Sequence, residues 1–395
     1  MSKARDMAEI ISTPPSIYST DAEVAATYLT QASASTIYKG SNFRNLIING
    51  DMHIAQRATS VASITVGGYH TVDRWNFGGD SLGTWTMSVE NDAPTGSGFR
   101  KSAKVLCTTA DASPAAGDYI VFLQRFEGQN LQQIFKGTSS AKELTLSFWV
   151  KANVTGTYIA ELSDIDNTRT VSKSYTVSAS ATWEKKTITF PADTTGAFDN
   201  DNALSLQLNF WLGAGSTFTG GSPLQTSWGT TTNTRVTGQT NLASATNNYW
   251  QITGVQLEVG STATEFEFLP AQVELALCQR YYEKSFPYAT APQNGPNSTS
   301  FVTTLGVLGY VSGNSMQVGF LKFTVQKRIA PTMTAYGNSS GQTKYRDSIT
   351  SSTDLWSVSA LQFYAISESG VTLYQNVVNN VVVPVQGHWV ADAEL

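Results

Sequence analysis

Two groups of closely spaced carboxylates offer the residue types that acid–base chemistry on a glycosidic bond requires. Asp164 and Asp166 lie close together, and the run Asp199-Asn200-Asp201-Asn202 carries another pair. A glycosidase needs a pair of carboxyl groups, one as acid and the other as base or nucleophile. Both groups lie in segments typical of turns between strands, where Asp and Asn side chains bond the backbone. The sequence therefore favours turn roles over catalysis.

The other residues that commonly carry catalysis are too dispersed to form a recognisable constellation. His53, His70 and His388 show neither the His-x3-His nor the Glu-x2-His spacing of a helical zinc site. No Gly-x-Ser-x-Gly segment stands between a strand and a helix, and no phosphate-binding loop is present. Cys107 and Cys278 lie far apart in apolar or helical patterns, which predicts buried free thiols. We therefore expect a protein that is not an enzyme.

A structural cation is the one cofactor that the acidic residues suggest. Ca²⁺ takes hard oxygen ligands from loops, and Asp199 and Asp201 lie in such a segment. Glu258 alternates with Leu257 and Val259, so its carboxylate is expected to face solvent, a loop or a cation. The spacing of an EF-hand loop is absent. The hypothesis is a structural Ca²⁺ at Asp199, Asp201 and Glu258, with no other cofactor.

Aromatic residues are the more useful signal for binding. The chain has 9 Trp, 16 Tyr and 18 Phe, and a chain so poor in charge must expose some of them. Trp149 and Trp183 lie inside apolar strand patterns and are predicted to be core residues. Trp85, Trp228 and Tyr249 stand beside Gly, Ser, Thr or Asn, where a ring can stack on a sugar. These three are the predicted glycan-binding residues, with burial in a subunit interface as the alternative.

The composition limits the partners further. Charged residues make up 14% of the 395 residues, against roughly 25% in typical soluble domains, and Ser, Thr, Asn and Gly take their place. A net charge of −5 without a cluster of Lys and Arg argues against nucleic acid. No apolar run is long enough for membrane insertion, and the N-terminus lacks the apolar core of a signal peptide. We expect synthesis in a cytoplasm without secretory export.

Residues 1–43 differ from the rest of the chain. Met7-Ala8-Glu9-Ile10-Ile11 predicts a short helix that stops at Pro14-Pro15, and a second helical pattern follows Asp21. Such short helices need a partner, which is either other copies of this chain or an acceptor on another protein, unless the segment is a frayed tail. The residues predicted to anchor the segment are Ala8, Ile10, Ile11, Val24, Tyr28 and Leu29.

Residues 44–269 show one strand pattern after another. The clearest are residues 118–124, 144–150, 157–162, 183–190, 204–212 and 249–259, separated by turns rich in Gly, Asn, Asp and Ser. Leu46-Ile47-Ile48 ahead of Asn49-Gly50 predicts a further strand and a hairpin turn. No helical pattern of useful length intervenes, which favours an antiparallel sandwich. The polar insertion at residues 213–245 is long enough to be functional or to bridge subunits.

Residues 270–286 predict a connecting helix that Pro270 opens and Pro287 ends. Residues 287–395 return to strand patterns and predict a smaller C-terminal β-domain. The fold class predicted for the whole chain is therefore all-β, with an N-terminal anchoring segment, a sandwich, a short helix and a second β-domain.

Three blocks of sequence resemble a domain found in phage tail fibres and tail-associated proteins. They are Asn45-Leu46-Ile47-Ile48-Asn49-Gly50-Asp51-Met52-His53-Ile54-Ala55-Gln56-Arg57 with Tyr69 and Asp73-Arg74-Trp75, then Val255-Gln256-Leu257-Glu258-Val259-Gly260 with Thr264-Glu265-Phe266, then Glu274-Leu275-Ala276-Leu277-Cys278-Gln279-Arg280-Tyr281-Tyr282-Glu283-Lys284. The resemblance implies a jelly-roll sandwich similar to carbohydrate-binding modules, and a place in a virion. Within the first block, Asp73 and Arg74 can pair beside Trp75.

These expectations combine into one hypothesis with two alternatives. By analogy with phage fibres, the chain would be a homotrimeric tail-fibre component of a virion that attaches to other virion proteins through residues 1–43. It would bind neutral host-surface glycan multivalently, since repeated weak contacts gain avidity. The alternatives are a head or neck decoration protein without a receptor role, and a glycan depolymerase.

Overall fold

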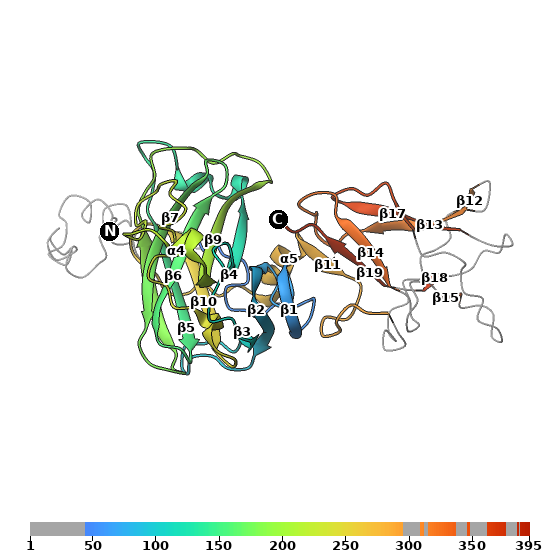
Figure 1. The fold of residues 1–395 in the computed structure, drawn as a ribbon. Helices are drawn as coiled ribbons and strands as arrows, with labels where there is room; N and C mark the ends of the chain where they lie inside the picture. The colour runs from blue at the N-terminus through green and yellow to red at the C-terminus, as the bar shows by residue number, and fades with distance from the viewer. Residues whose placement is uncertain are drawn as a thin grey trace, which may run out of the picture. The chain divides into compact units, whose positions relative to one another are not determined.

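A computed structural model describes residues 44–294, 309–311, 315–336, 346–347, 362–376, 385–386 and 388–395 (Figure 1). Residues Asn45–Leu395 form one compact unit. The predicted anchoring residues Ala8, Ile10, Ile11, Val24, Tyr28 and Leu29 lie outside the described residues.

The described residues are mostly β-strand, which confirms the predicted all-β class. The first part of the unit contains β1 (Ser60–Gly68), β2 (Trp75–Glu90), β3 (Ser102–Thr109), β4 (Tyr119–Glu127), β5 (Leu144–Ala152), β6 (Gly156–Asp164), β7 (Arg169–Val177), β8 (Glu184–Phe190), β9 (Leu204–Ala214) and β10 (Tyr249–Val259). The short helix α4 (Ser216–Thr219) and the 3-10 turns η1 (Gly128–Asn130), η2 (Gln132–Ile134) and η3 (Leu242–Ser244) connect them. The six strands predicted from clear patterns correspond to β4, β5, β6, β8, β9 and β10.

The long strand β2 joins the two halves of the sandwich. The strand order is β7-β6-β9-β4-β2-β3-β10-β5-β8, with all the neighbours antiparallel and β1 added on β2. Residues Trp75–Asp80 of β2 pair with β4, whereas its Thr84–Glu90 portion pairs with β3. Between them the chain turns at Ser81 and Gly83, whose φ values are 57° and 72°. A Cβ on Gly83 would lie 2.5 Å from the Thr109 carbonyl oxygen, so this bend requires glycine.

Aromatic side chains from both halves meet in the core. The Trp75 ring stacks on Phe122 of β4 with centroids 4.8 Å apart. Phe148 of β5 packs edge-on against Phe210 of β9 at 5.0 Å, and Trp250 of β10 packs edge-on against Phe122 at 5.8 Å. Each such pair contributes about 0.5–1.5 kcal/mol beyond the burial of its area. Two sheet halves around one apolar core confirm the predicted sandwich.

Two tryptophans predicted to be core residues lie on an outer face instead. Trp149 pairs with Lys185 of β8 and Thr253 of β10, and paired residues project from the same side of a sheet. Trp149 is half-buried there, while its neighbour Phe148 points into the core. Trp183 is also half-buried, with the Lys151 ammonium 5.2 Å from its ring. The core prediction for both was wrong. Trp149 has the opposite strand parity to the core residue Phe148, and Trp183 precedes β8 and donates to Asp92 at 3.2 Å.

The Asn49-Gly50 segment forms a buried corner and not the predicted hairpin. Residues 45–47 form no strand, although the Leu46 amide donates to the Leu257 carbonyl at 2.8 Å. Asn49 has φ 60°, and its side chain bonds both the amide and the carbonyl of Ile54 at 2.9 and 2.8 Å. A Cβ on Gly50 would lie 2.1 Å from the Val255 carbonyl oxygen. The corner therefore packs tightly against β10, the last strand of the sandwich.

The connecting helix is shorter than predicted. Helix α5 (Ala271–Gln279) follows Pro270 as expected, but it ends before the predicted limit at residue 286. The reason is that β11 (Tyr282–Lys284) pairs with β19 (His388–Asp392) near the end of the chain. Long-range pairing with β19 therefore takes this segment out of the helix, and β11 belongs to the C-terminal sheet. Among the described residues, no helix has the length and apolar character needed to cross a membrane.

The C-terminal part contains three small sheets. Their strands are β11, β12 (Gly309–Val311), β13 (Ser315–Lys322), β14 (Thr332–Tyr336), β15 (Arg346–Asp347), β16 (Gln362–Tyr364), β17 (Gly370–Asn376), β18 (Val385–Gln386) and β19. The sheet orders are β11-β19-β14, β12-β13-β17-β16 and β15-β18. A small apolar cluster around Phe323, Val371, Leu373 and Trp389 packs the first sheet against the second. This arrangement agrees with a second, smaller β-part.

Glu274 of α5 makes the stability of the fold depend on pH. Its carboxyl accepts the Asn49 amide, and burial raises its pKa to about 7, with Asp51 and Glu267 adding repulsion. A raised folded-state pKa means that stability is lost as pH rises from the unfolded pKa through 7. We expect Glu274→Gln to remove about 2 kcal/mol of pH dependence between about pH 5 and pH 8, measured by urea unfolding. The exposed Glu143→Gln is the control, and parallel curves for the wild type and Glu274→Gln would refute the assignment.

Candidate functional site

A groove lies where the sandwich meets the three-stranded sheet β11-β19-β14. Its floor is one face of that sheet, on which Tyr282, Asp392 and Thr332 are paired across the three strands. Thr334 and Val390 form the next row along the same strands. Met333 and Ala335, which alternate with these threonines, pack into the small C-terminal core. The alternation along β14 thus places its threonine hydroxyls on the groove side.

Arg57 of the sandwich supplies one wall of this junction groove. Its guanidinium lies over the Tyr282 ring at 3.7 Å and contacts the carboxylates of Asp392 at 3.2 Å and Glu394 at 3.4 Å. Burial lowers the pKa of Arg57, but the carboxylates of Glu394, Asp73 and Asp392 raise it on balance above its ordinary value. Ile329 and Ala330 line another part of the wall. The groove is therefore formed jointly by residues of the sandwich and of the C-terminal sheet.

The lining of the junction groove suits a ligand with many hydroxyl groups. Its volume is about 540 Å³, within the range of roughly 300–1,000 Å³ for small-molecule sites, and such sites favour domain junctions. The exposed Thr332 and Thr334, the Tyr336 ring and the 41% exposed side chain of Asp392 offer donors, acceptors and a stacking surface. Arg57 balances the charge of Asp392, so neither of these two lining residues is an unpaired charge.

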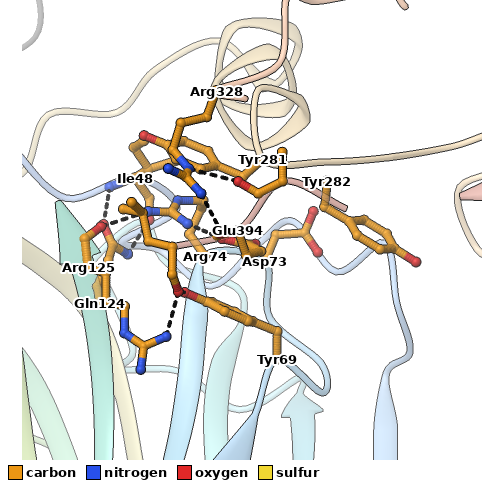
Figure 2. A network of polar contacts seen from close by, with 12 residues as sticks. Ile48, Tyr69, Asp73, Arg74, Gln124, Arg125, Tyr281, Tyr282, Arg328 and Glu394 are labelled. Carbon is orange, nitrogen blue, oxygen red and sulfur yellow. Dashed lines mark hydrogen bonds and ion pairs between the residues drawn. The ribbon is translucent and has the colours of Figure 1, made fainter. Parts of the chain in front are cut away.

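A buried network holds the two walls together (Figure 2). Arg74 is 1% exposed, forms an ion pair with Glu394, and lies over the Tyr281 ring at 3.4 Å. It also donates to the Arg125 carbonyl at 2.7 Å. Burial lowers the pKa of Arg74, whereas Glu394 raises it and the net shift is upward. The pair is therefore a charged contact inside the protein, between the sandwich and the last residues of the chain.

Backbone groups after β19 are bonded by further side chains of this network. Arg125 donates to the Leu395 carbonyl at 2.5 Å, and Tyr69 donates to the same oxygen at 3.3 Å. Arg328 donates to the carbonyls of Ala393 at 2.9 Å and Glu394 at 2.8 Å (Figure 2). Carbonyl oxygens bonded to guanidinium groups make strong, charge-assisted hydrogen bonds. These contacts fix the position of Asp392 and Glu394 in the groove.

The predicted pairing of Asp73 with Arg74 is wrong. Asp73 is fully buried and accepts hydrogen bonds from the Gln56 side chain at 2.5 Å and the Gln56 amide at 2.9 Å. Burial raises the pKa of Asp73, and the Arg57 charge opposes that rise. Arg74 turns instead toward Glu394, which is 320 residues away in the chain. Adjacent residues that point to different sides of a segment do not meet, whatever their charges.

The three predicted glycan-binding residues lie outside the junction groove. Trp85 is 1% exposed and donates to the Leu82 carbonyl at 2.7 Å, so its ring is a core residue that cannot stack on a sugar. Trp228 is half-buried and donates to the Pro191 carbonyl at 2.8 Å. Tyr249 is half-buried on the outer face of β10, with the Lys104 ammonium 4.9 Å from its ring. The Trp85 prediction failed because the polar neighbours of this residue point away from the core.

Two of the three predicted calcium ligands, Glu258 and Asp201, accept hydrogen bonds from residues close by in the sequence. Glu258 accepts from the amide and hydroxyl of Thr264, both at 2.8 Å. Asp201 accepts from the Ala203 amide at 2.9 Å, and the Asp199 amide donates to Asp166 at 3.0 Å. No group of three or more His, Cys, Asp or Glu residues suited to a metal occurs in the described part of the chain. Asp201 thus has the turn role that the sequence favoured, whereas Asp166 bonds a segment 33 residues away.

Sequence reasoning missed the residues that form the junction groove. Arg57 closes the first of the three resembling blocks, and Tyr282 belongs to the third, but their meeting depends on long-range packing. The alternation in Thr332-Met333-Thr334-Ala335-Tyr336 is a visible strand signal that could have identified one polar face. The two free thiols were predicted correctly, since Cys107 and Cys278 are both buried and unpaired.

No protein-family model and no curated protein sequence matches the chain. Among solved structures, the enzymatically active domain of bacteriophage CBA120 tailspike protein 4 is 16% identical with a TM-score of 0.29, over 55% of this chain and 22% of that chain. An arabinose-bound α-L-arabinofuranosidase is 10% identical with a TM-score of 0.30, over 61% of this chain and 30% of that chain. The family 11 carbohydrate-binding module of a Clostridium thermocellum cellulase is 12% identical with a TM-score of 0.27, over 52% of this chain and 98% of that chain. These similarities assign neither a family nor a ligand to the chain.

The ion pair between Arg74 and Glu394 is expected to dominate the stability of the junction. Glu394→Gln leaves a buried guanidinium without its carboxylate, which costs about 3 kcal/mol in comparable cases. We expect a lower urea midpoint with an unchanged slope, whereas the exposed control Glu368→Gln should change stability by no more than about 0.5 kcal/mol. Equal midpoints for Glu394→Gln and the wild type would refute this role.

Proposed function

We propose that the chain is a structural fibre protein of a phage virion, and that it binds neutral host-surface glycan without cleaving it. The virion setting rests on the resemblance of three sequence blocks to phage tail-fibre domains. The observation that carries glycan binding is the lining of the junction groove, where threonine hydroxyls, a carboxylate, a guanidinium and tyrosine rings converge on about 540 Å³.

Sugars present hydroxyl groups around an apolar ring face, and the junction groove offers partners for both. Asp392 accepts hydrogen bonds from hydroxyl groups, Arg57 donates them, and Thr332 and Thr334 do either. Tyr336 and Ile329 supply ring and aliphatic surface for the C–H face of a sugar. A polar site rejects a ligand that leaves its groups unpaired, so this lining favours an oligosaccharide over an apolar molecule.

The charges of the groove support binding over cleavage. Asp392 and Glu394 are the carboxylates of its lining, and both contact Arg57. Glu394 also pairs with Arg74. Both carboxylates are thus engaged in ion pairs with guanidinium groups, whereas a glycosidase needs two carboxyl groups that flank the glycosidic bond. The protein is therefore proposed to be a binding protein and not a depolymerase.

The proposal also includes attachment and trimerisation of the chain. Residues 1–43 are proposed to attach the chain to another tail protein and to help form a homotrimer. Three grooves on one fibre, and several fibres on one virion, would convert weak single contacts into firm attachment to a cell surface. A head or neck decoration protein could share the same β-folds but would not need a ligand groove.

Removal of the groove hydroxyls should weaken binding. The double variant Thr332→Val and Thr334→Val keeps β-branched side chains, which suit a strand, but removes two hydrogen-bonding groups. We expect the Kd for neutral oligosaccharides bound on a glycan array to rise about tenfold or more. The readout is binding of the full-length protein to the array.

The matched control is Thr65→Val, an exposed threonine in β1 outside the groove, which should bind as the wild type does. Unchanged binding by the groove variant would contradict the proposed site. Release of new reducing ends from host polysaccharide by the wild type would contradict the non-enzymatic role.

The place in the virion can be tested independently. Gold-labelled antibodies against the chain should decorate the tail of intact virions in electron micrographs. Decoration of capsid vertices or the neck would replace the fibre proposal with a head or neck decoration role.

A further inference from the structure

A second, smaller pocket lies on the sandwich, between the β6–β7 turn and the polar insertion. Its volume is about 260 Å³, roughly half that of the junction groove. Ser163 and Thr170 from β6 and β7 line it together with Thr168, residues 230–232 and Arg235. We call it the threonine pocket. None of its residues lines the junction groove.

The polar insertion is bonded firmly to the edge of the sheet beside this pocket. Thr170 and Gly229 exchange backbone hydrogen bonds of 2.8 and 3.0 Å, which adds a short bridge to β7. Gln225 donates to the carbonyl and hydroxyl of Thr170, both at 2.8 Å, and accepts from the Thr231 amide at 3.1 Å. The Trp228 indole donates a hydrogen bond to the Pro191 carbonyl. The wall formed by residues 230–232 is therefore held in place and is not a loose loop.

The charged groups around the threonine pocket are satisfied by one another. Arg235 forms two hydrogen bonds with Glu161, of 2.8 and 2.6 Å, and Glu161 is fully buried. Asp164 pairs with Lys136 at 2.5 Å and accepts from the Asn167 amide at 3.0 Å. Each charge has an opposite partner, so no net charge remains to select an ionic ligand. These pairs also fix the side chains beneath the pocket.

The hydroxyl group of Thr170 accepts from Gln225, but other hydroxyl groups of the pocket have no partner in the described part of the chain. Ser163 is only 7% exposed, yet neither its hydroxyl nor those of Thr168, Thr230 and Thr232 makes a hydrogen bond within the described part of the chain. A hydroxyl group both donates and accepts. Thr168, Thr230 and Thr232 are exposed, and none of the four hydroxyl groups is a buried atom without a partner, so each is accessible to water or a ligand. The pocket thus offers several accessible hydroxyl groups beside charged side chains that pair with one another.

We infer that the threonine pocket binds a single neutral sugar residue, such as the end residue of a glycan chain. This inference rests on the proposed function, since it adds a second sugar site to the same chain. A volume of about 260 Å³ lies below the roughly 300–1,000 Å³ of larger ligand sites, which limits the occupant to about one ring. A ligand held at both the pocket and the groove, or on separate glycan chains, gains avidity.

The test uses the full-length protein and four free monosaccharides: glucose, galactose, mannose and N-acetylglucosamine. Saturation-transfer NMR should show that at least one of them binds to the wild type. The double variant Thr230→Val and Thr232→Val should weaken that binding about tenfold or more, because two hydrogen-bonding groups are removed. Thr231→Trp, which fills the pocket from an exposed position, should abolish it.

The groove variant with Thr332→Val and Thr334→Val separates this inference from the proposed function. It should keep the monosaccharide signal, since its changes lie outside the threonine pocket. Loss of oligosaccharide binding in the pocket variants alone would support the pocket and contradict the groove. The inference is overturned if no monosaccharide binds, or if binding survives in both pocket variants.

Discussion

The buried ion pair between Arg74 and Glu394 is the contact on which the arrangement of the two β-parts depends. Loss of either charge in the packed structure would leave the other buried without its partner, so the pair favours keeping the sandwich and residues 393–395 in contact. The surrounding groups reinforce the pair: Tyr281 covers Arg74, and Arg328 bonds the backbone of the last residues. The network joins residues 320 positions apart, so it holds the segment after β19 against the sandwich. The junction groove is a consequence of that contact.

The segment between the sandwich and the C-terminal sheet contacts the first and contributes a strand to the second. Arg280, just after α5, forms two hydrogen bonds with Glu127 of β4, of 2.8 and 2.6 Å, and Tyr281 bonds the same carboxylate. The next residues form β11 and pair with β19. A cut at residue 285 would therefore remove an edge strand from the C-terminal sheet, which the predicted boundary between residues 286 and 287 did not anticipate. The two parts form separate sheets, but the segment that connects them packs against both.

The two cavities follow one physical pattern. In each, the charged side chains are paired, while threonine hydroxyls remain available along the walls. A chain with only 14% charged residues builds polar surfaces from Ser, Thr and Asn, and such surfaces recognise neutral hydroxyl-rich ligands at no cost in unpaired charge. The same composition that argued against nucleic acid therefore agrees with glycan binding. Paired carboxylates also explain why acidic residues near a cavity need not be catalytic.

The sequence alone determined the all-β class, six of the sandwich strands and the start of α5, because strand alternation and the role of Pro270 are local properties. It also determined the turn role of Asp201, since its bond to the Ala203 amide is local. Only the tertiary structure decided that Trp85 is buried, that Trp149 faces outward, and that Arg74 meets Glu394 and not Asp73. Burial depends on which face of a strand is covered by distant segments, and ion pairs depend on which distant side chains meet. Neither burial nor ion pairing can be inferred from neighbouring residues in the sequence. Both candidate sugar sites could therefore be identified only in the folded chain.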